Sequence, residues 1–358
     1  MTVTTPAGFT AAGLACGIKP SGDPDLSLVA TTDGRPVAAA AVFTQNRMTA
    51  APVITTNAHL TLTGGRAAAV VLNSGCANAA TGAPGLADAE AMCATVAEAL
   101  GCRPEEVLVC STGLIGDRLP MAAITTGIPD LVARRSAQGG SDAAEAIRTT
   151  DTHRKEALVE GEGFVVGGMA KGAAMLAPNM ATMLAVLTTD AAVEPDELGA
   201  ALRAGVAESF NALSTDGCTS TNDTVILLAS GAAGAPADEA AFRSTVAAAC
   251  LDLARQMARD AEGHTKVVDV RVTGAASDDD ARAGARKVAE SQLVKCSWYG
   301  CDPYWGRIAS ELGTAGIALE PDKLTIRYGD LVVADGGVAA LVDEQALATY
   351  MAGDHLEV

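Results

Sequence analysis

Residues 167–190 of this 358-residue chain read GGMAKGAAMLAPNMATMLAVLTTD. Lys171 stands alone there among apolar residues, although burying an unpaired ammonium group is costly. Pro178 and Asn179 form a turn signal directly before an apolar run with the character of a buried strand. The stretch therefore predicts a sharp turn that leads into a buried strand, with the hydroxyl of Thr182 at the entrance of that strand.

A hydroxyl in this position suits a nucleophile. Threonine is a poor nucleophile unless a base activates it, and its own freed α-amine can be that base. The amine becomes free only if the peptide bond between Ala181 and Thr182 is cut. In the simpler interpretation the methionines of this stretch fill a core, which is their usual role. That interpretation explains neither the lone Lys171 nor the turn.

The rest of the chain alternates short β-rich runs with alanine-rich stretches, which indicates an α/β fold. We expect strands at 27–31, 37–44, 52–56, 68–73, 107–111, 163–167, 181–189, 223–229, 266–273, 323–328 and 331–334, and one beginning at 355. We expect helices at 84–100, 130–148, 195–209, 238–261, 277–290 and 343–351. The polar stretch Gly274–Asp280 predicts a boundary between a domain at 1–275 and a smaller α/β domain at 276–358.

Composition excludes several classes of function. The chain has 25 basic and 43 acidic residues, a formal charge of −18, and such a surface repels nucleic acid and anionic lipid. The nine cysteines include no CxxC pair, so we expect reduced, buried thiols in a cytoplasmic protein. The four histidines lack metal-ligand spacing and no phosphate-binding glycine motif is present, so we expect neither a metal nor a nucleotide cofactor.

The segment Lys171–Leu184 resembles the self-cleavage segment of the ornithine acetyltransferase (glutamate N-acetyltransferase, ArgJ) family. Further segments resemble other parts of that family in the same order, and the resemblance extends from about residue 7 to the last residue. They are Gly8–Gly17, Asn73–Gly82, Ser111–Gly116, Thr149–Thr152, Asp216–Thr224, Asp260–Lys266 and Lys295–Arg307.

The resemblance implies an αββα sandwich followed by a smaller C-terminal α/β domain. It makes Thr182 the nucleophile, so that cleavage after Ala181 gives an α chain, 1–181, and a β chain, 182–358. Thr112 and Gly113 would form the oxyanion hole, in which a hydroxyl and a backbone N–H stabilise developing negative charge. The residues that would line the substrate pocket with Thr182 are Thr149, Lys171 and Glu262. Taken in isolation, Glu262 would be read as a solvated carboxylate and Thr112-Gly113 as an ordinary strand end.

The implied reaction is a ping-pong transfer in arginine biosynthesis. N2-acetylornithine acylates Thr182 and leaves as ornithine, and glutamate then takes the acetyl group, while the α-amine of Thr182 moves the protons. Some relatives also accept acetyl-CoA, and two α and two β chains would assemble into a heterotetramer.

Two alternatives stay open at this point. A related self-processing aminopeptidase shares the nucleophile but releases the acyl group to water. The second alternative is an inactive remnant, because family members continue beyond the position of Val358 with a segment that supplies an Asn and a Ser or Thr to the substrate site. On this basis we expect the C-terminal domain to be incomplete.

Overall fold

The computed structural model describes residues 2–176 and 183–358, which fall into two compact units, Met1–Glu262 and Gly263–Val358. The division comes earlier in the chain than the predicted boundary after residue 275. The reason is that β11 (Val267–Asp269) pairs in parallel with β15 (His355–Glu357), so the stretch after residue 262 belongs to the C-terminal unit. The Lys266 ammonium adds to this attachment by donating hydrogen bonds to two carbonyls near the end of the last helix.

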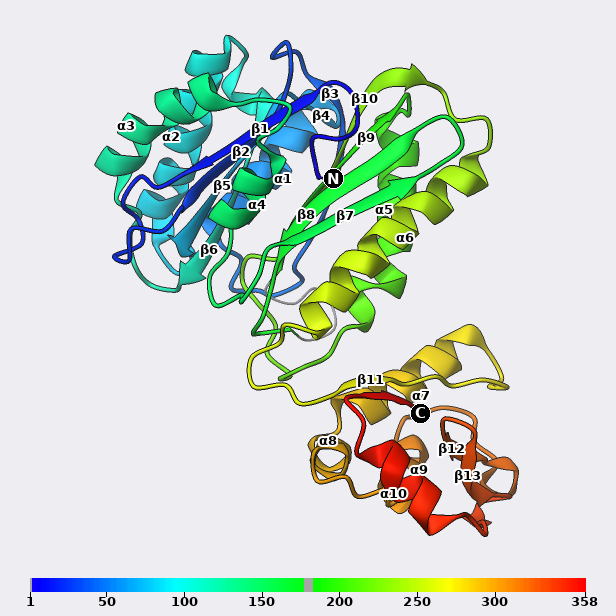
Figure 1. Ribbon diagram of the computed structural model, residues 1–358. Coiled ribbons are helices and arrows are strands. Elements are labelled where there is room, and N and C mark those ends of the chain that lie inside the picture. The colour runs from blue at the N-terminus through cyan, green and yellow to red at the C-terminus, as the bar shows by residue number, and fades with distance from the viewer. Residues whose placement is uncertain (1, 177–182) are drawn as a thin grey trace. The chain divides into compact units, whose positions relative to one another are not determined.

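Two sheets form the inner layers of the N-terminal unit (Figure 1). In spatial order, the first consists of β1 (Phe9–Leu14), β2 (Leu26–Thr31), β5 (Ala69–Cys76) and β6 (Val107–Leu114). The second consists of β4 (Arg66–Ala67), β3 (Val37–Phe43), β10 (Thr224–Gly234), β9 (Leu184–Ala191), β8 (Val165–Lys171) and β7 (Lys155–Glu160).

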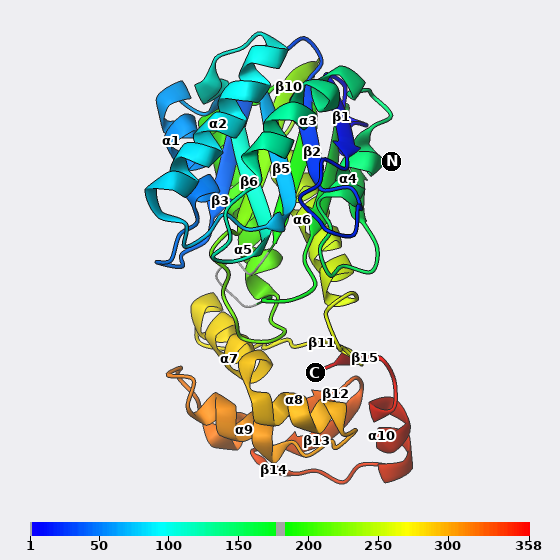
Figure 2. The same cartoon turned by 90° about the vertical axis from the view of Figure 1, so that its left-hand side faces the viewer.

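Helices cover the outer face of each sheet. The first sheet packs against α2 (Gly82–Leu100) and α3 (Met121–Arg134), which lie in front of it in Figure 2. The helix α1 (Ala51–Thr63) lies along the edge of this sheet, where the Thr56 hydroxyl bonds both backbone polar groups of Val109 in β6. The second packs against α5 (Pro195–Glu208) and α6 (Glu239–Ala258). A further helix, α4 (Gly140–Ala146), contributes to the core between the sheets. The order helix, sheet, sheet, helix confirms the predicted αββα sandwich.

The alternation of side chains along β10 shows why the layers form. Val225 and Leu227 point to the helices α5 and α6, whereas Ile226 and Leu228 point to the other sheet. Successive side chains of a strand face opposite sides, so a strand that is apolar at every position needs cover on both faces. The sandwich supplies that cover.

Two predicted elements are wrong. Residues 52–56, expected as a strand, lie in α1, because Pro52 occupies the first turn of that helix, where its fixed φ is favourable. Residues 130–148, expected as one helix, form the end of α3 and all of α4. The chain breaks between them because Ser136 pairs with Ala11 of β1, and the backbone of Gly139 approaches Ala11 so closely that a side chain there would collide with its carbonyl.

The C-terminal unit has a small core of its own, built mainly from helices. These are α7 (Asp278–Glu290), α8 (Gln292–Tyr299), α9 (Gly306–Gly313) and α10 (Glu344–Met351). They pack with β12 (Ile326–Tyr328) and β13 (Leu331–Asp335), which carries the short β14 (Val338–Ala339) at its edge. A single turn of 3-10 helix lies in this unit at Pro321–Lys323, and two others lie in the N-terminal unit at Pro104–Glu106 and Phe210–Ala212. Ser277 and Asp343 cap α7 and α10 with their side chains, which confirms the predicted starts of both helices.

All nine cysteines are free thiols. Cys218, Cys296 and Cys301 are exposed, contrary to expectation, and the other six are buried or half-buried. Among the helices that the structure describes, none combines the length and the apolar character needed to cross a membrane.

Candidate active site

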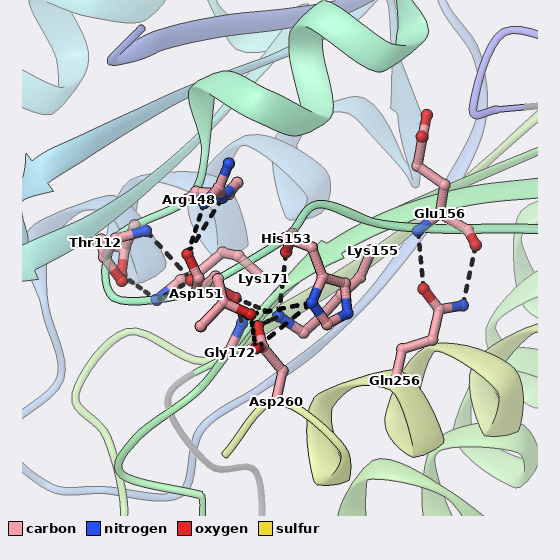
Figure 3. A network of polar contacts seen from close by, with 12 residues as sticks. Thr112, Arg148, Asp151, His153, Lys155, Glu156, Lys171, Gly172, Gln256 and Asp260 are labelled. Carbon is pink, nitrogen blue, oxygen red and sulfur yellow. Dashed lines mark hydrogen bonds and ion pairs between the residues drawn. The ribbon is translucent and has the colours of Figure 1, made fainter. Parts of the chain in front are cut away.

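The two sheets bring predicted site residues together where the chain enters β9. Lys171 ends β8 and lies directly across from Leu184, the first residue of β9, which in turn lies across from Thr224 of β10. From this row the Lys171 ammonium reaches across to the other sheet and donates a hydrogen bond to the Thr112 hydroxyl of β6, with 3.3 Å between Nζ and Oγ1 (Figure 3). Both side chains are buried. Two of the predicted site residues, Lys171 and Thr112, are therefore in direct contact.

Gly113 follows Thr112 in a conformation that only glycine adopts readily. Its φ is +133°, and a Cβ atom there would lie 2.2 Å from the carbonyl carbon of Gly75 on the neighbouring strand. The glycine lets β5 and β6 approach each other closely at the exposed end of β6. A backbone in this position can present its N–H groups to a ligand, as an oxyanion hole requires.

Asp151 connects the site to a buried network of charges. Its carboxylate accepts a hydrogen bond from Lys155 Nζ at 2.7 Å and one from the Gly172 N–H at 2.7 Å, and it lies 3.9 Å from Lys171 Nζ. Lys155 also donates to Asp260 at 2.6 Å. Two lysines thus meet two aspartates, which satisfies the rule that buried charges are paired.

The pKa values follow from this pairing. Burial alone would raise the pKa of Asp151, but the charges of Lys171 and Lys155 and the hydrogen bonds outweigh burial and lower it to about 2. Burial lowers the pKa of Lys171, and the negative charge of Asp151 opposes that effect. Asp151 therefore carries a negative charge near neutral pH and favours the charged form of Lys171.

Thr149 and Glu262 lie beside the same network. The Thr149 N–H donates to Asp151 at 3.1 Å, and the Glu262 N–H donates to the carbonyl of Ala173, in the segment after β8, at 2.7 Å. The side chain of Glu262 is exposed, and Thr149 is half-buried. The structure thus groups Thr112, Gly113, Lys171, Thr149 and Glu262 around one end of the sandwich. The predicted nucleophile Thr182 and its neighbour Ala181 lie outside the described residues.

Sequence reasoning missed the roles of Asp151, Lys155 and Asp260. Asp151 and Asp260 belong to segments that carried the family resemblance, yet neither was singled out. Lys155 opens a strand of mixed polar and apolar residues, KEALVE, in which a lysine is normally exposed. The one available signal was the presence of charged residues inside the matching segments.

The fold is an αββα sandwich, with two sheets between helical layers. A hydroxyl, a glycine with positive φ and a paired lysine lie together at the entrance of a central strand, and they define a candidate acyl-transfer site. A family model described as the ArgJ family matches residues 10–358, and the chain belongs to this family.

Individual relatives are similar over most of their length. The chain is 50% identical over 337 residues to the arginine biosynthesis bifunctional protein ArgJ of Thermobifida fusca, covering 94% of this chain and 87% of that protein. It is 52% identical over 343 residues to the protein of the same name from Mycolicibacterium paratuberculosis, covering 93% and 84%. A crystal structure of ornithine acetyltransferase from Mycobacterium tuberculosis in complex with ornithine is 47% identical and covers 49% of this chain and 94% of that one, with a TM-score of 0.45.

Proposed function

We propose that the protein is an acyltransferase of arginine biosynthesis that moves the acetyl group of N2-acetylornithine to glutamate through an acetyl-Thr182 intermediate. Acetyl-CoA would be a second possible donor. The active form would consist of an α chain, 1–181, and a β chain, 182–358, assembled as a heterotetramer of two of each.

The first step would create the nucleophile. The Thr182 hydroxyl attacks the carbonyl carbon of Ala181 and the peptide C–N bond breaks. The hydroxyl loses its proton and the Thr182 nitrogen gains one. Water then hydrolyses the resulting ester, which leaves a carboxylate on Ala181 and a free amine on Thr182. That amine is the base that the hydroxyl needs, since a free α-amine has a pKa near neutrality.

Acetyl transfer would use the described residues for charge stabilisation and binding. The Thr112 hydroxyl already accepts a hydrogen bond from Lys171, so its own proton is available for donation to the oxyanion of the tetrahedral intermediate. The Gly113 N–H is the second donor. The exposed carboxylate of Glu262 suits the ammonium end of ornithine, and the ammonium group of Lys171 suits the carboxylate or acetamide end.

The observation that supports this function best is the hydrogen bond between Lys171 and Thr112. It joins the two sheets beside the first residue of β9, two positions after Thr182 in the chain. The names of the relatives, which are arginine biosynthesis bifunctional proteins, are consistent with the proposal.

Intact-mass spectrometry tests the proposal directly. The purified parent protein should give two masses that correspond to cleavage after Ala181, and incubation with N2-acetylornithine alone should add one acetyl group to the β chain. Thr182→Ala should remain a single uncut chain without an acetyl adduct. Thr126→Ala serves as the matched control, because Thr126 is exposed on α3, and this variant should behave like the parent.

The acceptor then separates the transferase from an aminopeptidase. Glutamate should discharge the acetyl-β chain and yield acetylglutamate much faster than water alone yields acetate. Discharge at the same rate with and without glutamate would support the hydrolytic alternative. An uncut parent protein without any acetyl adduct would contradict the proposed function.

A further inference from the structure

Two adjacent residues before β10, Asn222 and Asp223, contact both halves of the site. Both side chains are buried, at 4% and 0% exposure, in the interior of a loop that leads into β10. Neither has a role in the function proposed above.

Asn222 contacts the strand that carries the candidate oxyanion hole. Its side-chain amide donates to the carbonyl of Ala77 at 2.6 Å and to the carbonyl of Ser111 at 2.9 Å. Ser111 directly precedes Thr112 in β6. One N–H of the amide therefore holds the backbone directly before Thr112, the other holds the residue that follows β5, and the amide oxygen accepts a hydrogen bond from the Thr221 hydroxyl.

Asp223 contacts the residue that directly precedes β9, on the other side of the site. Its Oδ1 atom accepts a hydrogen bond from the N–H of Met183 at 2.9 Å, and the following residue, Thr224, donates its own N–H to the Met183 carbonyl at 3.2 Å. Both backbone polar groups of Met183 are thus held by this segment. Met183 directly follows Thr182 in the chain.

The loop that carries the pair is itself anchored to a third segment, after β3. The N–H of Thr44 donates to the Asp223 carbonyl at 3.0 Å, and the Thr44 hydroxyl donates to the carbonyl of Ser220 at 2.7 Å. The N–H of Ala50 donates to the carbonyl of Thr221 at 3.0 Å. These hydrogen bonds hold the loop that carries Asn222 and Asp223 against the segment after β3.

From this geometry we infer that Asn222 and Asp223 are positioning residues, which set the distance between the nucleophile that follows Ala181 and the oxyanion hole at Thr112. The inference rests on the proposed function, because it assigns the pair to the Thr182 nucleophile. Neither side chain takes part in bond making. Each acts through the neighbouring backbone, where a displacement of about 1 Å can lower a rate about 100-fold.

The protonation state of Asp223 indicates which substitution is conservative. Burial raises its pKa to about 8, against the lowering effect of the Met183 hydrogen bond and of the Lys171 charge, so the carboxyl group is neutral at pH 7. A neutral carboxyl and a carboxamide have the same planar shape, and each offers a carbonyl oxygen as acceptor, beside one O–H donor in the carboxyl and two N–H donors in the carboxamide. Asparagine at this position can therefore keep the bond to Met183, whereas leucine fills the space without an acceptor.

The experiment compares Asp223→Asn with Asp223→Leu in self-cleavage, followed by denaturing gel and intact mass. Asp223→Leu should cleave at least about 100-fold more slowly than the parent, and Asp223→Asn should restore the rate to within about 3-fold. Circular dichroism and the melting temperature check folding, and Asp223→Ala replaces the leucine variant if that variant does not fold. Cleavage of both the leucine and alanine variants at the parent rate would overturn the role of Asp223.

Asn222 is tested in the acetyl-transfer step. Asn222→Leu should lower kcat at least about 10-fold while KM stays within about 3-fold, because an oxyanion donor acts in the transition state rather than in substrate binding. The matched control is Asn57→Leu, because Asn57 is exposed on α1, and this variant is expected to change neither constant. An Asn222→Leu variant with the parent kcat would overturn the role of Asn222.

The parent protein separates this inference from the proposed function. If the parent neither cleaves nor transfers acetyl, the proposed function fails and the inference falls with it. If the parent is active and the leucine variants match it, the inference alone is wrong.

Discussion

Replacing Lys155 with methionine tests whether the buried charges of the candidate site hold the N-terminal unit together. Lys155 is fully buried, and its ammonium group lies 2.7 Å from Asp151 and 2.6 Å from Asp260. Methionine keeps most of the side-chain volume and removes the charge. The substitution therefore leaves two buried carboxylates without their shared partner.

We expect a large decrease in the free energy of unfolding, because the carboxylates of Asp151 and Asp260 stay buried. Removing one partner of a buried ion pair costs about 3–5 kcal/mol, since it leaves an uncompensated charge. At about 2–4 °C per kcal/mol for a unit of this size, the melting temperature should fall by about 6–20 °C. Arg154 supplies the matched control: it precedes Lys155, is half exposed and pairs with Glu156 at 2.9 Å. Arg154→Met should cost about 0–1 kcal/mol, as exposed ion pairs do.

Urea unfolding followed by circular dichroism measures both variants against the parent. The free energies of unfolding of Lys155→Met and the parent should differ most near neutral pH. The difference should become smaller in acid, because protonation neutralises the two carboxylates that have lost Lys155. In the parent, Asp151 stabilises the fold above its ordinary pKa of 3.8 and loses this contribution as the pH falls through about 2. A cost for Lys155→Met below about 1 kcal/mol, or equal to that of Arg154→Met, would refute this account of the network.

Three further predictions concern the residues around the site. Thr112→Val should lower kcat for acetyl transfer by about 10²–10³-fold, as loss of one oxyanion donor does, and a kcat within a few-fold of the parent in a folded variant would exclude Thr112 from the mechanism. The free energy of unfolding of the parent should fall as pH rises from about 4 to about 8, because unfolding releases the proton of Asp223, and Asp223→Asn should flatten this decline in urea titrations. Gly113→Ala should lower the melting temperature more than Gly116→Ala, since both glycines have positive φ but only Gly113 faces backbone atoms; equal melting temperatures would contradict the close approach to Gly75.

The layers of the fold were predictable because their signals are local. Alanine-rich stretches and turn residues mark α2, α5 and α6, and Gly101 ends α2 in the left-handed conformation expected of it. Where the prediction failed, a distant contact decided the structure. The break between α3 and α4 depends on β1, whose backbone Gly139 approaches closely.

The candidate site was predictable only in part for the same reason. A lysine alone in apolar sequence indicated that Lys171 is buried and has a function, and the structure places it beside Thr112. Its partner Asp151 could not be inferred from spacing, because the two meet only through the pairing of β7 with β8 and the loop before β7. Asn222 is similar: nothing in its neighbourhood along the chain indicates that its amide reaches Ser111.

The strand order of the larger sheet has a consequence for the two chains that self-cleavage would produce. The order across the sheet is β4, β3, β10, β9, β8 and β7. The two strands of the β chain, β10 and β9, therefore lie between two pairs of strands of the α chain. A cut after Ala181 would leave the β chain hydrogen-bonded to the α chain along both of its edges, antiparallel to β3 on one side and to β8 on the other. The two chains could separate only if the backbone hydrogen bonds between β10 and β3 and those between β9 and β8 broke together. Cleavage would therefore create a new N-terminus while the two chains stay associated. Fragments produced separately would each expose unpaired strands and would be prone to aggregate.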